Sequence, residues 1–241
     1  HKTVRRQRQM CIRDRHITWL LDWSDRNTAV LFGDGAGAVV IEESKNESDG
    51  EIYSFSNGLS SDNLEILEIP NFGSAMDRFN PDEAARVRWT FDGQEIFKSG
   101  VRAMAQASAE AIEKSGLSKE DVDIFIPHQA NIRIVEALEK KLGLPNATTI
   151  KKVHRYGNTS AASIPTAFVD ALEEGEIKGG EIAVFTAVGA GLAWGACAVR
   201  LGDRVTPINK SDAKLPDFDG TATDTIKRAI EYQVPDKLDK I

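Results

Sequence analysis

An apolar strand, a polar loop and an amphipathic helix follow one another in VDIFIPHQANIRIVEALEKKL, residues 122–142. Residues 122–127 are short and apolar, which is typical of a buried strand. The apolar residues then repeat at helical spacing, at Ile132, Val135, Leu138 and Leu142. Gly143 and Pro145 end that helix. A strand that leads directly into a helix is the unit from which layered α/β folds are built.

The same alternation continues on both sides of this unit. Helical spacing predicts one helix over residues 97–112 and another over residues 164–172, each followed by a glycine. Strands are predicted at residues 148–153, at 181–187 and, after a glycine-rich turn, at 192–201. The order of these elements indicates an α/β architecture.

Two more strands are predicted nearer the N-terminus, at residues 28–32 and 38–42, around the glycines of GDGAG at 33–37. A dinucleotide loop would need a helix after the glycines, but a β-branched run follows them. We therefore interpret the segment as a glycine hairpin whose missing side chains allow close packing. Residues 43–90 are polar, contain several turn signals and are expected to form an irregular connecting segment.

Composition limits the classes of protein to which the chain can belong. Among 241 residues, 41% are hydrophobic and the net charge is −7, which indicates a globular protein and disfavours non-specific nucleic-acid binding. The apolar runs are too short to span a membrane. Cys11 and Cys197 cannot form a disulfide framework or a cysteine metal site, so we expect a reducing compartment, the cytoplasm.

The two ends of the chain differ from the middle. Residues 1–15 are strongly basic and have neither the serines of a transit peptide nor the apolar stretch of a secretory signal. We expect them to be foreign to the fold or disordered, with a nucleic-acid-binding arm as the alternative. Residues 203–241 are polar, with one weak helix around 223–232, and are expected to form a C-terminal extension on the surface.

His128 is the first candidate for chemistry. It lies in PHQAN, residues 127–131, at the carboxyl end of a predicted strand, where open α/β sheets bind their ligands. The start of the next helix is nearby, and its partial positive charge disfavours an imidazolium. A neutral imidazole there can donate a hydrogen bond. The alternative is a histidine that only satisfies buried backbone groups.

Asn158 is the second candidate. It lies in YGNTSAAS, residues 156–163, just before the third predicted helix, and can be a simple N-cap. However, the small residues that follow it would let another molecule approach the start of the helix. An asparagine amide can donate to a developing oxyanion but cannot act as a base or nucleophile.

No nucleophile accompanies this pair in the sequence. Cys197 lies within an apolar strand and is expected to be an inert core thiol, while Cys11 lies in the basic segment. His154 is a rival base, but its basic neighbours suggest a solvated surface histidine. No metal-binding spacing such as HExxH occurs, so no metal is expected.

Four segments together resemble a known family. FGDGAGAVV, PHQANIRIVEALEKKLG, YGNTSAASIPTAF and GAGLAWGACAVRL, in this order, are similar to β-ketoacyl-acyl-carrier-protein synthase III, the initiating condensing enzyme of type II fatty-acid synthesis. The resemblance covers roughly residues 17–202 and implies the layered αβαβα thiolase fold. It implies that residues 16–42 end the N-terminal thiolase-like half and that residues 91–202 form the C-terminal domain.

The resemblance also implies a chemistry. The family uses a Cys–His–Asn triad, in which cysteine accepts an acyl group from acyl-CoA, and His128 and Asn158 match the other two members. It implies substrate or carrier-protein binding by Gln129, Ala130, Asn131, Arg133, Gly189 and Ala190, with Ala190 standing where the family often has glycine. Acyl carrier protein, acyl-CoA and a second copy of the chain are the implied partners. No cofactor is implied, because the substrates carry CoA or phosphopantetheine thioesters.

The chain also departs from the family. The N-terminal half that carries the nucleophilic cysteine has no match here, and Cys11 is not in a matching context. We therefore expect this chain to be a C-terminal part that is inactive in condensation by itself and exposes apolar surface. Two alternatives stay open: a condensing enzyme of secondary metabolism with the same His–Asn pair, and a non-catalytic carrier-protein-binding fragment.

Overall fold

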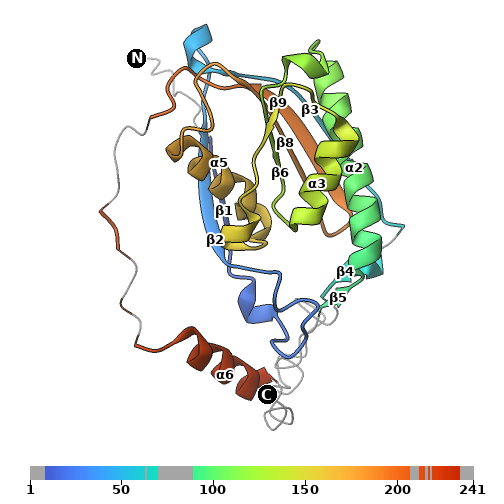
Figure 1. Cartoon of the computed structure of the whole chain (residues 1–241), viewed down its shortest axis with the longest axis vertical. Helices are drawn as coiled ribbons and strands as arrows, with labels where there is room; N and C mark the ends of the chain where they lie inside the picture. The colour runs from blue at the N-terminus through green and yellow to red at the C-terminus, as the bar shows by residue number, and fades with distance from the viewer. Residues whose placement is uncertain are drawn as a thin grey trace, which may run out of the picture.

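The computed structural model describes residues 9–62, 64–69, 89–206, 212–214, 217 and 219–233. Its centre is a five-stranded sheet in the order β3, β9, β8, β6, β7 (Figure 1). These strands are β3 (Glu51–Leu59), β6 (Ile124–Pro127), β7 (Thr148–Thr149), β8 (Ile182–Gly189) and β9 (Ala193–Arg200). β6 pairs in parallel with β7 and β8, whereas β9 pairs antiparallel with β8 and β3.

Helices cover both faces of this sheet. α2 (Gly93–Lys114) and α3 (Ile132–Leu142) lie on one face, and α5 (Ser163–Glu173) lies on the other (Figure 1). Beyond α5 lies a second, two-stranded sheet of β1 (Gln9–Arg15) and β2 (Gly35–Ile41). The described residues therefore stack in four layers, which confirms the predicted α/β class.

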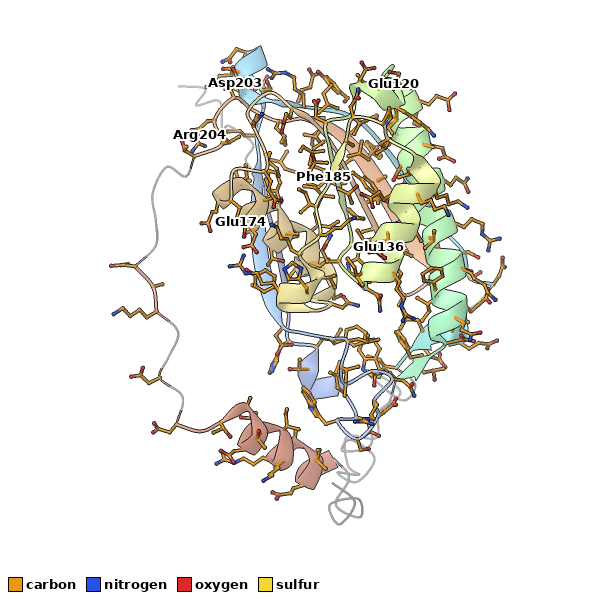
Figure 2. The ribbon with its side chains drawn as sticks, viewed as in Figure 1. Glu120, Glu136, Glu174, Phe185, Asp203 and Arg204 are labelled. Atoms are coloured by element: carbon orange, nitrogen blue, oxygen red, sulfur yellow. The ribbon has the colours of Figure 1, made fainter. Side chains whose placement is uncertain are left out.

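The two-residue period of the strands explains why helices are needed on both faces. Phe125 and Val184 point into one apolar cluster, shared with α2 and α3. Their neighbours Ile124 and Ala183 point into a second cluster, shared with α5. In that second cluster Phe185, labelled in Figure 2, meets the Phe168 ring edge-on at a centroid distance of 5.6 Å. A strand buried on both faces reads as a continuous apolar run, as β6 does.

Most of the predicted elements are confirmed. The helices expected at 97–112, 132–142 and 164–172 are α2, α3 and α5, and the one expected near 223–232 is α6 (Ala222–Gln233). The strand predicted at 148–153 is shorter than expected: β7 ends at Thr149, and α4 (Val153–Tyr156) begins after an irregular stretch of three residues. The shorter elements are η1 (Thr18–Leu20), η2 (Glu47–Asp49), η3 (Leu64–Ile66), β4 (Leu67–Glu68), β5 (Thr90–Phe91), η5 (Lys119–Asp121) and η6 (Ser160–Ala162).

The prediction of a glycine hairpin between strands at 28–32 and 38–42 is wrong. Residues 28–31 form turns, in which the amides of Thr28 and Ala29 bond to the Asp25 carbonyl, so they do not form a strand. The glycines continue directly into β2 and face the start of α5 and η6. A Cβ on Gly37 would stand 2.5 Å from the Pro165 Cβ, so the predicted close packing is confirmed even though the hairpin is not.

The expectation for the N-terminal segment is also corrected. Residues 1–8 lie outside the described part of the chain, but residues 9–15 form β1 and pair with β2 along their whole length, with Arg15 opposite Gly35. Strand pairing uses backbone groups, which every residue in this segment supplies. A basic composition therefore did not keep these residues out of the fold.

The prediction that residues 43–90 form an irregular connecting segment is wrong for residues 51–59, which form β3 on the edge of the main sheet. The strand was missed because its polar side chains face the protein and its large apolar ones face solvent, the reverse of the usual pattern. Ser54 and Ser56 face α2, where their hydroxyls donate to the Ala111 carbonyl and the Glu110 carboxylate. The large Phe55 side chain between them is 70% exposed. Within the same segment, residues 63 and 70–88 lie outside the described residues.

No helix in the described ranges is long and apolar enough to cross a bilayer.

Candidate active site

The chemistry-bearing loops meet at one cavity of about 1170 Å³. It lies where β6 and β8 end, which is the edge of the sheet predicted from the position of PHQAN. Seven of the eight predicted site residues line it: His128, Ala130, Asn131, Arg133, Asn158, Gly189 and Ala190. The structure therefore brings together residues that are up to 62 positions apart, from His128 to Ala190.

His128 is fixed directly after β6. Its backbone amide donates to the Thr186 carbonyl of β8 at 2.7 Å, which continues the pairing between these two strands. The side chain is 8% exposed, and its Nδ1 lies 2.6 Å from the Ser163 hydroxyl. Burial lowers the pKa of His128 to about 4, so the imidazole is neutral at pH 7. The predicted neutral state is supported, with burial as the cause of the lowered pKa.

Asn158 is held by the strand-like segment before β2. Its amide donates to the Leu31 carbonyl at 2.8 Å, and its carbonyl accepts from the Gly33 amide at 3.0 Å. The side-chain Oδ1 accepts from the Ser160 amide at 2.9 Å. This bond occupies the acceptor end and leaves the two Nδ2 hydrogens for the cavity. Asn158 is not the N-cap of α5, since that position belongs to Ala162.

The loop that carries Asn158 adopts an unusual backbone. Ser160 has φ of 52°, in the left-handed region that residues with a Cβ rarely occupy. The Asn158–Ser160 hydrogen bond closes the turn around it. Strained conformations of this kind persist where the surrounding structure imposes them, and they are concentrated at functional sites.

The loop after His128 divides into lining and structural residues. Asn131 caps α3, with its Oδ1 accepting from the Arg133 amide at 2.9 Å, and it also lines the cavity. Arg133 is exposed at the rim. Its guanidinium is thus free to approach an acidic partner from solvent.

Gln129 does not reach the cavity, so its predicted contact with carrier protein is corrected. It is 2% exposed, and its amide nitrogen donates to the carbonyls of Pro127 and Ile150. Its Oε1 accepts from the Lys152 amide at 2.8 Å. An amide side chain can satisfy donors and acceptors at once, and here it joins the PHQAN loop to residues 150–152.

An aromatic wall, consisting of Phe32, Trp89 and Phe91, lines the same cavity and was missed by the sequence analysis. The Phe32 ring lies 5.1 Å from Trp89 and 6.1 Å from Phe91, measured between centroids. The three side chains come from two separate segments of no regular periodicity, so no sequence signal marked them. The cavity thus offers an apolar wall together with two neutral amide- and imidazole-type donors.

No cysteine side chain among the described residues lines this cavity. Cys197 is inside β9, and burial raises the pKa of its thiol, which agrees with an inert core residue. Cys11 lies in β1, but its side chain is outside the described set. His154 is exposed on α4, as expected of a surface histidine. In the described ranges no three His, Cys, Asp or Glu side chains gather as a metal site would require.

A network of hydrogen bonds and ion pairs joins α4 to α5, the two helices that flank the Asn158 loop. Asp170 of α5 accepts from the Tyr156 hydroxyl at 2.9 Å and from Arg155 at 3.0 Å. Glu174, labelled in Figure 2, accepts from Arg155 and from the buried Lys152. These bonds join α4 to α5 on both sides of the Asn158 loop, so they limit its movement.

Two family models match the chain. 3-Oxoacyl-[acyl-carrier-protein (ACP)] synthase III matches residues 3–60, and 3-Oxoacyl-[acyl-carrier-protein (ACP)] synthase III C terminal matches residues 112–201. A relative from Vibrio cholerae, beta-ketoacyl-[acyl-carrier-protein] synthase III 2, is 48% identical over 90% of this chain and 59% of its own length. The chain thus spans about three fifths of that relative.

Solved structures agree with these matches. 3-Oxoacyl-[acyl-carrier-protein] synthase III from Aquifex aeolicus is 38% identical, with a TM-score of 0.69 over 80% of this chain and 57% of that one. The priming β-ketosynthase of the R1128 polyketide pathway is 31% identical, with a TM-score of 0.73 over 81% and 57%. Fold and site together define an α/β protein of the thiolase fold. Within that class, the chain belongs to the 3-oxoacyl-acyl-carrier-protein synthase III family.

Proposed function

We propose that the protein of which these residues are part condenses acyl-CoA with malonyl-acyl-carrier protein and so initiates fatty-acid synthesis. The observation that carries this proposal is the pair of neutral donors at one cavity. Burial keeps His128 uncharged, and the Ser160 amide occupies the acceptor end of Asn158. Two neutral donors at one cavity suit a carbonyl oxygen that becomes negatively charged during a reaction.

The chemistry that such a pair supports is decarboxylation of a malonyl thioester. As the carboxylate leaves as carbon dioxide, the electron pair of the broken carbon–carbon bond passes to the α-carbon and the thioester oxygen. His128 and Asn158 donate to that oxygen and lower the energy of the enolate. The enolate carbon then attacks an acyl-thioester on cysteine, the thiolate leaves, and a 3-oxoacyl thioester forms.

The acceptor cysteine is the part of the reaction that the described residues do not provide, since neither Cys197 nor any other described thiol lines the cavity. We therefore assign decarboxylation to the residues in this chain and condensation to the longer protein. The similarity to full-length relatives named as β-ketoacyl synthases supports that division.

The proposed partners, acyl carrier protein and its thioester arm, follow from the charge and polarity of the cavity and its rim. Exposed Arg133 at the rim suits the acidic surface of an acyl carrier protein, and the aromatic wall suits the apolar part of a thioester arm. A homodimer and a cytoplasmic location remain proposals that follow from the family.

A second candidate is a priming ketosynthase of secondary metabolism. The similarity to the R1128 polyketide enzyme favours it, because that structure matches with a TM-score of 0.73. Both candidates use the same two donors and differ in the acyl group that they accept. A non-catalytic carrier-protein-binding fragment is less well supported, because it would not need a buried neutral histidine at the cavity.

The decisive test compares this chain with a version extended at its N-terminal end to the length of its relatives. Both are given malonyl-acyl-carrier protein and acetyl-CoA, and carbon dioxide and 3-oxoacyl product are measured. We expect product from the extended protein only, and its loss in His128→Ala and Asn158→Ala. An extended, folded protein that makes no product from acetyl-CoA or longer acyl-CoAs would overturn the proposal. Product only with other primers would favour the polyketide alternative.

A further inference from the structure

Ser163 is the only described residue that contacts the inner ring nitrogen of His128. Its hydroxyl oxygen lies 2.6 Å from Nδ1 and 3.2 Å from the backbone nitrogen of Gln129. Ser163 is buried, and it begins α5, the helix that packs against β6. The proposed reaction gives Ser163 no part, although it touches the residue on which that reaction depends.

The hydrogen atoms in this cluster can be counted. A serine hydroxyl has one hydrogen and two lone pairs, and a neutral imidazole has one hydrogen on either Nδ1 or Nε2. The backbone N–H of Gln129 can only donate, so it takes one lone pair of the Ser163 hydroxyl oxygen. The hydroxyl hydrogen and one lone pair remain for Nδ1.

Two arrangements are then open, and they place the imidazole hydrogen differently. If Nδ1–H donates to Ser163, the hydroxyl hydrogen needs another acceptor, and none contacts it among the described residues. A buried hydroxyl without an acceptor is unfavourable. If the hydroxyl instead donates to Nδ1, every group in the cluster is satisfied and the imidazole hydrogen is on Nε2.

We propose that Ser163 is a positioning residue that holds His128 in the Nε2–H tautomer, so that its hydrogen points to the cavity. Nδ1 is occupied by Ser163, which leaves Nε2 as the nitrogen that faces the cavity lining. In the opposite tautomer Nε2 would present a lone pair and repel a developing oxyanion. Ser163 thus acts on His128 as Ser160 acts on Asn158: each occupies the acceptor atom and leaves the donor free.

Burial makes this control necessary. His128 is neutral, so it has one ring hydrogen rather than two, and its direction is decided by the partner of the inner nitrogen. A carboxylate in the place of Ser163 would favour Nδ1–H or an imidazolium. A hydroxyl that already accepts from the Gln129 amide is biased toward donating to Nδ1.

The tautomer can be read by NMR in this chain as it stands, from the ring nitrogen shifts of a sample labelled with 15N-histidine. The signal of His128 is assigned by its loss in His128→Gln. At pH 7 we expect the Nε2–H pattern for the wild type. In Ser163→Ala we expect that pattern to be lost in favour of Nδ1–H or an averaged pattern.

Thr166→Ala is the matched control, because Thr166 carries a hydroxyl on the same helix that donates to the Ala162 and Ser163 carbonyls and not to His128. It should retain the Nε2–H pattern. An Nδ1–H pattern in the wild type, or an unchanged pattern in a folded Ser163→Ala, would overturn the inference. If Ser163→Ala does not fold, Ser163→Cys replaces it, because a thiol is a weaker hydrogen-bond donor of similar size, and the same loss of the Nε2–H pattern is expected.

The catalytic meaning of this tautomer rests on the proposed function, but the NMR result does not. If the Nε2–H form is present in the wild type and lost in Ser163→Ala, but the extended protein makes no condensation product, the proposed function fails and the role of Ser163 in orienting His128 stands. If product forms but the tautomer is Nδ1–H, only the role of Ser163 fails.

Discussion

Phe32 and Asn158 form an isolated parallel bridge, which joins the aromatic wall of the cavity to the loop of the candidate amide donor. The bridge depends on a close approach at the next residue. A Cβ on Gly33 would stand 2.2 Å from the Tyr156 carbonyl oxygen, which is a backbone atom and cannot rotate away. The position of Asn158 is therefore determined in part by the absence of one side chain in a segment distant in sequence.

Gly33→Ala should consequently lower stability and displace Asn158. Overpacking of this kind costs about 1–3 kcal/mol. We expect a loss of that size in urea unfolding, together with altered amide shifts around Asn158. Gly100→Ala is the control, because its Cβ would meet only the Val188 side chain at 3.4 Å, within helix α2. Equal stability of Gly33→Ala and wild type would show that the bridge is not constrained as described.

Stability should fall in mild acid because of His128. Its pKa is about 4 in the folded protein and 6.5 in the unfolded chain, so the unfolded state binds the proton more readily. The stabilisation that comes from neutral His128 is therefore fully present above pH 6.5 and is lost as the pH falls toward 4. At pH 5 the free energy of unfolding should be about 2 kcal/mol lower than at neutral pH. This follows because pH 5 lies about 1.5 units below the unfolded pKa, and each unit corresponds to about 1.36 kcal/mol.

The measurement is urea unfolding at pH 7 and pH 5 for wild type, His128→Gln and His154→Gln. His128→Gln should show a smaller decrease between the two pH values than the wild type. His154→Gln removes an exposed histidine and should behave like the wild type. Identical pH dependence in all three proteins would contradict the buried, neutral state of His128.

The sequence predicted elements best where periodicity and burial agree. β6 and α3 were found because four buried residues in a row and a clear helical repeat adjoin each other. β3 was not found because its serines, not its aromatic residues, face the helix. β1 was excluded on charge, although backbone pairing with β2 does not depend on charge.

Prediction of the site followed the same physics. His128 and Asn158 were identified because polar loops follow a strand or precede a helix at one edge of the sheet. Gln129 was misplaced because its amide is used to satisfy buried backbone groups, which depends on tertiary contacts with residues 150–152. Ser163 was not predicted as a site residue, because its contact with His128 joins residues 35 positions apart.

Removing the Asp170 carboxylate should loosen the Asn158 loop. Asp170 is buried and accepts from both Tyr156 and Arg155, so Asp170→Ala removes the acceptor of the Tyr156 hydroxyl and one of the two acceptors of Arg155. We expect a loss of about 1–3 kcal/mol, and a smaller loss of about 1 kcal/mol for Tyr156→Phe. In a double-mutant cycle the two losses should not add, since they remove the same bond.

An exposed ion pair provides the comparison for that cycle. Lys98 and Glu95 lie 3.4 Å apart on the surface of α2, with 67% and 37% of their side chains exposed. Lys98→Ala should change stability by less than about 1 kcal/mol. If Asp170→Ala cost no more than Lys98→Ala, the network would not restrain the loop.

The apolar face of β3 should bind a hydrophobic dye in this chain. Phe55 is 70% exposed and Leu59 is 73% exposed on an edge strand, so water contacts a patch that folded proteins usually cover. Phe55→Ser removes the aromatic ring from this patch without opening a cavity. We expect lower dye fluorescence and less aggregation, with stability within about 0.5 kcal/mol of the wild type. Phe125→Ser, in the core beneath α2 and α3, is the contrasting change and should unfold the protein. Dye binding that persists in Phe55→Ser at the wild-type level would place the accessible apolar surface elsewhere on the molecule.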